Sequence, residues 1–93
     1  MNLKSKNFNL YLRGCVGELE EQFILYEIHV DMVNCHLEVG DKIACFHEYP
    51  ITIEEAIEDI KQRRARIASV RDVLLERYPE AKDMITEQRI LDL

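Results

Sequence analysis

The sequence contains few residues that interrupt helices and strands, since it has only three glycines and two prolines in 93 residues. It also contains no tryptophan. Low-complexity tracts and Pro- or Gly-rich linkers are missing, which argues against a disordered region. With 47 % hydrophobic residues, the composition is that of an ordinary globular protein. A chain of this length builds one hydrophobic core, so we expect a single domain over residues 1–93.

The sequence also lacks segments that direct a protein to a membrane. No apolar run near Met1 could act as a signal peptide, and no run is long enough to span a bilayer. The three cysteines, Cys15, Cys35 and Cys45, show no CxxC spacing. An odd number of cysteines without a signal peptide is typical of free thiols in a reducing compartment. We therefore expect a cytosolic protein without membrane contacts.

Motifs of the common enzyme classes are missing as well. The P-loop, nucleophile-elbow and dinucleotide-binding glycine patterns do not occur. The formal net charge of −6 disfavours general affinity for nucleic acid, because such affinity comes from neutralising phosphates. These absences favour a protein that is not an enzyme and carries no cofactor.

The clearest element is a helix from Thr52 to Arg77. Thr52 and Glu55 have the spacing of a capping box, and acidic residues gather in the first turns, where the helix dipole favours negative charge. Pro79 disfavours helical geometry in the residue before it, so we expect the helix to end at Arg77 or Tyr78. A second, short C-terminal helix is expected to begin at Pro79.

The residues before this helix alternate between apolar and polar side chains, which is the pattern of half-buried strands. The alternation is clearest in residues 22–32, where five side chains share one face: Ile24, Tyr26, Ile28, Val30 and Met32. After Met32 the phase reverses, which predicts a tight turn or a bulge. Further strands are predicted over residues 7–16, 33–39 and 42–47, with a hairpin turn at Gly40-Asp41.

Strands followed by helices predict an α+β fold. We expect an N-terminal antiparallel β-meander of three to four strands, covered by one long helix and a short C-terminal helix. Ile28 in the clearest strand and Ile60 in the long helix should then be almost fully buried. Replacing either by alanine would cost about 2–5 kcal/mol.

The predicted hairpin would set His36 opposite Cys45, with His47 diagonally on the same face. Side chains of these types can bind zinc, with water as the fourth ligand. Ordinary solvent-exposed strand residues explain the same pattern, and the spacing matches no common zinc signature. We therefore expect no metal, and a hairpin zinc site is the weaker alternative.

Positive charge is concentrated in the long helix: Lys61, Arg63, Arg64, Arg66 and Arg71. A nucleic-acid-associated regulator would use such a segment. Asp59 and Arg63 have the spacing of an intrahelical ion pair, which favours a charge-balanced, solvated helix face instead. Nucleic-acid binding through residues 61–66 is therefore the alternative and not the main prediction.

The apolar stripe of the long helix is wider than one contact surface requires. Its seam consists of residues at intervals of seven: Ile53, Ile60, Ile67 and Leu74. Four further residues broaden the stripe: Ile57, Ala68, Val70 and Leu75. A second contact, with the C-terminal helix or with another subunit, would use this excess.

Charge along the helix is arranged in blocks, acidic over residues 54–59 and basic over residues 61–66. Two antiparallel copies would place each acidic block beside the basic block of the other copy. We therefore predict a homodimer through residues 52–77. Seven residues are expected to take part in protein interaction: Glu54, Glu55, Ile57, Glu58, Ile60, Arg63 and Arg64.

Size, charge and missing motifs predict a small acidic cytosolic module that binds or regulates a larger protein. Adaptors, inhibitors and antagonists are commonly of this kind, including those carried by phages and mobile elements. The sequence contains no motif that identifies the protein partner.

Overall fold

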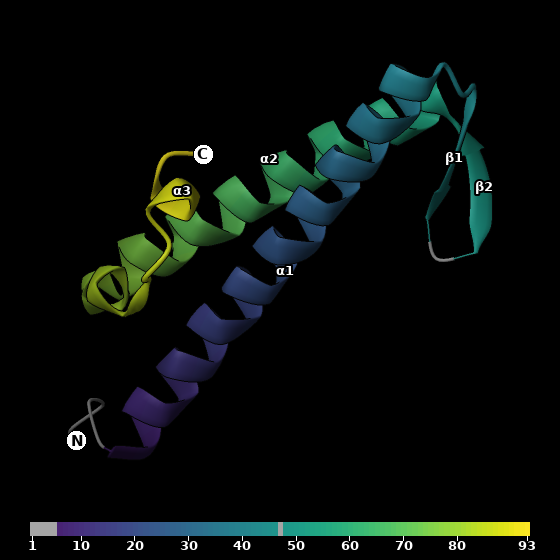
Figure 1. Cartoon of the computed structure of the whole chain (residues 1–93). Coiled ribbons are helices and arrows are strands. Elements are labelled where there is room, and N and C mark those ends of the chain that lie inside the picture. Colours follow the sequence, from purple (N-terminus) through teal and green to yellow (C-terminus); the bar gives the residue numbers. More distant parts are fainter. Residues whose placement is uncertain (1–5, 47) are drawn as a thin grey trace.

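The computed structural model describes residues 6–46 and 48–93 (Figure 1). It is an elongated helical hairpin with extents of 57 × 24 × 18 Å. Helix α1 spans Lys6–Val39, and helix α2, Ile53–Arg77, runs back along it in the opposite direction. At 1.5 Å per residue α1 is roughly 51 Å long, so this helix sets the length of the molecule. No helix among the described residues combines the length and the apolar character needed to cross a bilayer.

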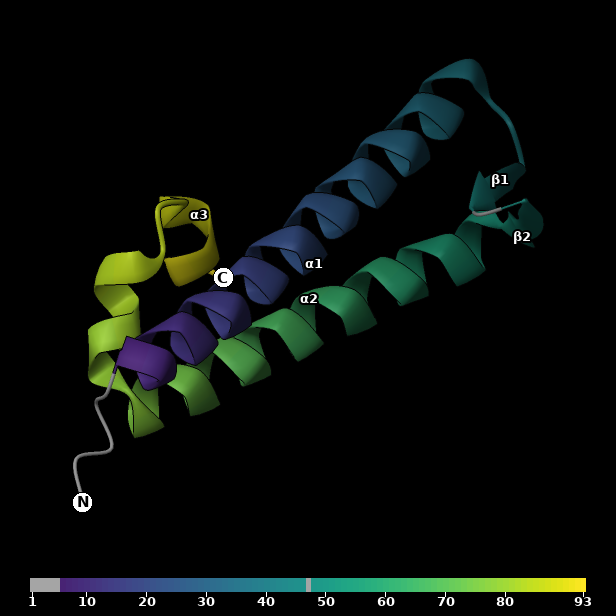
Figure 2. The same ribbon diagram turned by 90° about the horizontal axis from the view of Figure 1, so that it is seen from below.

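Short elements lie at the two ends of this helix pair. At one end an antiparallel two-stranded hairpin joins α1 to α2, with β1 spanning Ile43–Phe46 and β2 spanning Tyr49–Thr52. At the other end the chain continues into a 3₁₀ helix, η1, over Pro79–Met84, and a short helix, α3, over Gln88–Leu91. Figure 2 shows that this C-terminal segment, residues 79–93, folds back beside the helix pair.

The predicted N-terminal β-meander is wrong. The residues expected to form strands over 7–16, 22–32 and 33–39 belong to α1, and the described sheet has two short strands instead of three or four. The physical reason is the spacing of the buried side chains. Leu12, Val16, Leu19 and Phe23 are all buried and follow in steps of four, three and four. This is the spacing of a single helix face.

The alternation in residues 22–32 does not mark the face that packs. Ile24 and Ile28 are 56 % and 47 % exposed, so the predicted burial of Ile28 is wrong. Ile60, which was also expected to be almost fully buried, is half-buried. The side chains on one helix face repeat about every 3.6 residues, so they match an alternating pattern only over a short stretch. This explains why the alternation of apolar residues reverses phase after Met32 without a turn.

The predicted hairpin turn at Gly40-Asp41 is instead the C-terminal end of α1. Gly40 has a φ of 79°, and the Asp41 amide donates a hydrogen bond to the His36 carbonyl at 2.9 Å. This is a Schellman motif, in which glycine is preferred because a side chain would strain the left-handed backbone. The actual hairpin follows later, where Phe46 pairs with Tyr49.

Helix α2 begins and ends where the sequence predicts. The Thr52 hydroxyl accepts a hydrogen bond from the Glu55 amide at 3.2 Å. The same hydroxyl lies 3.2 Å from the Glu55 carboxylate, to which it donates. The helix ends at Arg77, two residues before Pro79. The short C-terminal helix is confirmed as well, although it is divided into η1 and α3.

Apolar side chains pack in two clusters along the helix pair. The larger cluster joins α1, α2 and the C-terminal segment: Leu12, Val16, Leu19, Phe23, Ile67, Ala81, Ile85 and Ile90. The smaller cluster fixes the β-hairpin to both helices: Val33, Ala44, Phe46, Ile53 and Ala56. Next to the smaller cluster the buried ring of His29 stacks on Phe46, with ring centroids 4.4 Å apart. The hairpin and the C-terminal segment thus hold the two long helices together at both ends.

Arg71 fastens the C-terminal segment to α2. Its side chain is buried, and its Nη1 donates to the carbonyl oxygens of Ile90, Leu91 and Leu93 at 2.9, 3.3 and 2.7 Å. The other guanidinium nitrogens contact the Asp72 carboxylate at 2.8 and 2.9 Å. Arginine is suited to this position because its planar fork donates in several directions at once.

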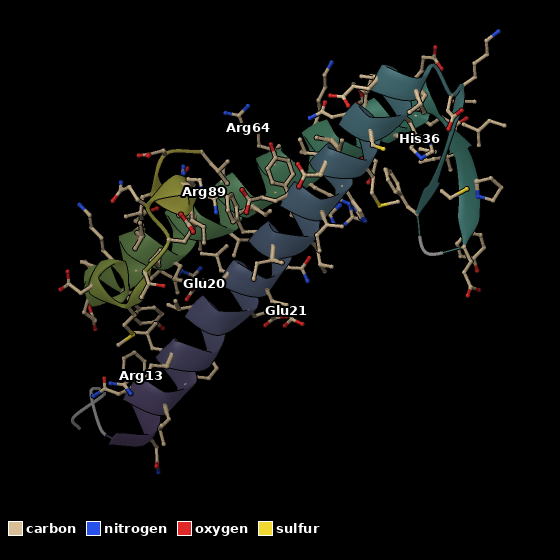
Figure 3. The ribbon with its side chains drawn as sticks, viewed as in Figure 1. Arg13, Glu20, Glu21, His36, Arg64 and Arg89 are labelled. Atoms are coloured by element: carbon tan, nitrogen blue, oxygen red, sulfur yellow. The ribbon has the colours of Figure 1, made fainter. Side chains whose placement is uncertain are left out.

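A second set of contacts fastens the C-terminal segment to α1. Arg89 of α3 forms an ion pair with Glu27, and its guanidinium lies 5.4 Å from the centroid of the Phe23 ring. The Thr86 hydroxyl donates to the Glu20 carboxylate at 3.2 Å. Figure 3 shows Arg89 and Glu20 on the side of the helix pair where this segment lies. One side of the helix pair is therefore covered by the chain itself.

Candidate functional site

Another side of the helix pair carries an open groove of about 710 Å³ between α1 and α2. On α1 it is lined by Tyr11, Cys15, Glu18, Leu19 and Gln22. The other side is lined by Ser69, by Tyr78 directly after α2, and by apolar and basic residues of α2. The apolar ones are Ile67, Val70, Val73 and Leu74. The basic ones are Arg63, Arg66 and Arg77.

Regular helical spacing produces this groove. On α1 the residues Tyr11, Cys15, Glu18 and Gln22 follow in steps of four, three and four. On α2 the stripe formed by Arg63, Arg66, Val70, Val73 and Arg77 follows in steps of three and four. Residues at such intervals lie on one face of a helix. Each helix therefore presents a continuous stripe to the groove.

The groove exposes apolar side chains to solvent. Val70 and Val73 are 51 % and 46 % exposed, and Tyr11 is 64 % exposed. The sequence predicts a second contact for the wide apolar stripe of α2, and the C-terminal segment covers part of it, since Leu75 packs on the larger cluster. Val70 belongs to the part that stays uncovered.

The two walls of the groove differ in charge. The α2 wall carries three arginines, whereas Glu18 is the charged residue of the α1 wall. Arg63 donates through Nε to the Asp59 carboxylate at 2.7 Å, which confirms the intrahelical ion pair predicted from the sequence. Arg66 and Arg77 are exposed. The α2 wall is therefore the more positive one.

Tyr11 and Cys15 form the polar part of the α1 wall. The interaction with the neighbouring Cys15 side chain raises the pKa of Tyr11 above its ordinary value. The phenol therefore stays protonated and neutral well above neutral pH.

The seven residues predicted for protein interaction lie on several faces of α2. Glu54, Glu55, Glu58 and Arg64 are exposed. Ile57 and Ile60 are half-buried and pack against the smaller cluster of their own chain. Arg63 lines the groove. The homodimer through residues 52–77 stays a prediction, and its apolar contribution would have to come from side chains that already have intramolecular contacts.

The structure does not bring the residues of the alternative zinc site onto facing strands. His36 lies on α1, where its Nδ1 is 3.2 Å from the Asp41 carboxylate. Cys45 lies on β1, is exposed and pairs with Pro50 in the sheet. His47 lies outside the described residues. Within residues 6–46 and 48–93, no three His, Cys, Asp or Glu side chains are grouped closely enough to hold a metal ion.

The basic run of α2 does not form one surface. Arg63 and Arg66 line the groove, whereas Lys61 and Arg64 are exposed and do not belong to its lining. Figure 3 shows the Arg64 side chain pointing away from α2. Nucleic-acid binding through residues 61–66 stays the alternative prediction, and it would draw on arginines from different faces of the helix.

Sequence reasoning missed the α1 half of the groove. A strand over residues 7–16 places Tyr11 and Cys15 on the face opposite Leu12 and Val16, which gives them no relation to α2. The heptad-like spacing of Leu12, Val16 and Leu19 is the signal that identifies α1 as a helix, and that assignment places Tyr11 and Cys15 beside the packed face.

No protein-family model matches this chain, and neither a curated protein nor a solved structure matches it.

Proposed function

We propose that this chain is a non-catalytic protein-binding module, acting as an adaptor, inhibitor or antagonist, and that the groove between α1 and α2 receives its partner. The observation that carries the proposal is the exposure of Tyr11, Val70 and Val73, which all line this groove. Contiguous exposed apolar surface with a polar rim is typical of a protein-interaction site.

The shape of the groove supports this function. Two antiparallel helices form its walls, and one further helix laid between them would bury the exposed valines. Grooves of this kind commonly receive an amphipathic helix, which places residues at i, i+3, i+4 and i+7 on the apolar floor. The C-terminal segment already packs against the helix pair on its other side, so the fold accommodates additional helical layers.

The sequence supports the remaining parts of the proposal. It lacks the phosphate-binding and nucleophile motifs of the common enzyme classes. Its three cysteines are free in the structure, and Cys35 and Cys45 are exposed. Exposed thiols are compatible with a reducing compartment, and we propose that the chain acts in the cytosol.

The test replaces both exposed valines of the groove. Full-length protein carrying Val70→Gln and Val73→Gln is immobilised and compared with the wild type in capture from a lysate of the native cell. Losing the burial of two valine side chains removes about 1–2 kcal/mol, so we expect about a tenfold weaker capture of the specific partner. Captured proteins are quantified by mass spectrometry.

The chain offers a matched control on α1. Ile24 and Ile28 are 56 % and 47 % exposed, close to the values of Val70 and Val73, but they do not line the groove. Substituting glutamine at both control positions should leave capture of the partner unchanged. Equal capture by the groove variant and the wild type, or equal loss in the control variant, would contradict the proposal.

A further inference from the structure

The charge of the groove is opposite in sign to that of the whole chain. Three arginines and one glutamate line it, which gives a formal charge of +2 on a chain of −6. Arg63 is paired with Asp59, but Arg66 and Arg77 are exposed and form no ion pair with another described residue. Positive charge is therefore available along the α2 wall.

The groove has the length of three to four helical turns. Its α1 wall runs from Tyr11 to Gln22, which is roughly 16 Å at the helical rise of 1.5 Å per residue. Its other wall runs from Arg63 of α2 to Tyr78, the residue that follows this helix, which is roughly 22 Å. A helix of about 11–15 residues matches these lengths.

We propose that the occupant of the groove is an acidic amphipathic helix of a partner protein. Its apolar residues would pack on Tyr11, Val70 and Val73, and its Asp and Glu side chains would face Arg66 and Arg77. This inference rests on the proposed function, because it specifies the chemistry of the partner at the same site.

The charge difference between the walls also determines which flank of the bound helix faces α2. Arg66 and Arg77 are eleven residues apart on one stripe, so they contact acidic residues near the two ends of the bound helix. Glu18 on the α1 wall repels acidic residues, which keeps them on the flank facing α2. The apolar floor supplies most of the affinity, and the arginines select for negative charge.

The test measures binding of three helical peptides of about 15 residues to the full-length protein by fluorescence anisotropy. The peptides share one apolar face, and their polar face carries glutamate, glutamine or lysine. A staple on the outward side keeps each peptide helical, because free helices of this length are marginal in water. We expect the glutamate peptide to bind about five- to tenfold more tightly than the glutamine peptide. Added salt should reduce this difference.

Charge reversal on the protein provides the second part of the test. In the variant Arg66→Glu/Arg77→Glu, the order of the peptides should invert, so that the lysine peptide binds most tightly. Arg64→Glu is the matched control, because Arg64 is an exposed arginine of α2 that does not line the groove. The control variant should keep the wild-type order of affinities.

Equal binding of the three peptides, with all three weakened by Val70→Gln/Val73→Gln, would overturn the inference and leave the proposed function standing. Self-association of the chain, measured by sedimentation and abolished by the same valine variant, would overturn both, since a second copy would then occupy the groove. Binding of no peptide up to about 1 mM also overturns the inference. In that case the capture experiment decides on the proposed function separately.

Discussion

Replacing Arg71 by methionine is expected to lower the free energy of unfolding by about 2–4 kcal/mol, because a hydrogen bond to a charged donor contributes about 1.5–3 kcal/mol. Methionine keeps most of the buried volume and removes every donor. The carbonyl oxygens of Ile90, Leu91 and Leu93 would lose the Nη1 group that holds them. The C-terminal segment should then detach before the helix pair unfolds.

Urea unfolding followed by circular dichroism gives the free energy, and amide hydrogen exchange shows which residues lose protection. Loss should be greatest in residues 79–93. Arg64→Met is the matched control, since Arg64 is exposed on the same helix, and it should change stability by no more than about 0.5 kcal/mol. An Arg71→Met protein with wild-type stability and wild-type exchange would show that Arg71 does not fasten this segment.

Replacing Leu12 by alanine is expected to lower the free energy of unfolding by about 2–5 kcal/mol. Leu12 is fully buried in the larger cluster, so truncation leaves a cavity between α1 and the elements packed on it. The loss should appear as a lower midpoint in urea with the slope of the transition unchanged.

Leu10 supplies the control two residues earlier. It is 59 % exposed, so Leu10→Ala should change stability by no more than about 0.5 kcal/mol. The comparison also separates the helix from the strand that the sequence predicts, because a strand over residues 7–16 places Leu10 and Leu12 on the same face. Equal losses for the two variants would argue against α1 and in favour of that strand.

The sequence predicted α2 correctly because its ends depend on local chemistry. A side-chain oxygen at Thr52 satisfies an amide of the first turn, and Pro79 prevents the helix from continuing. Neither effect requires knowledge of any other element. The pair Asp59–Arg63 was predictable for the same reason, since both residues belong to consecutive turns of one helix.

The fold class was not predicted correctly, because the apolar residues around 22–32 fit both the period of a strand and the period of a helix. Ile24, Tyr26 and Ile28 alternate as in a strand, while Leu19, Phe23 and Tyr26 follow the steps of a helix. Which residues are buried depends on the partner surface, and α2 and the C-terminal segment provide it for the helical set. The number of residues over which each pattern persists distinguishes helix from strand. The helical spacing continues from Leu12 to Val33, whereas the alternation changes phase after Met32.

The candidate site was only half predictable. The width of the apolar stripe on α2 indicated uncovered surface, and Val70 is indeed 51 % exposed. Which of the arginines face that surface depends on α1, so Arg66 and Arg64 could not be distinguished. Arg71 was counted with the basic run, because no local pattern shows that the carbonyl groups of residues 90–93 converge on it.

The central claim, that the groove between α1 and α2 is the binding surface, is tested most directly by methyl NMR of the full-length protein titrated with the glutamate peptide. Valine methyl groups report on the groove, and isoleucine methyl groups report on the exposed surface of α1 outside it. We predict shift changes at Val70 and Val73 and unchanged signals from Ile24 and Ile28, which have similar exposure outside the groove. Unchanged Val70 and Val73 signals, or changes centred on Ile24 and Ile28, would contradict the claim.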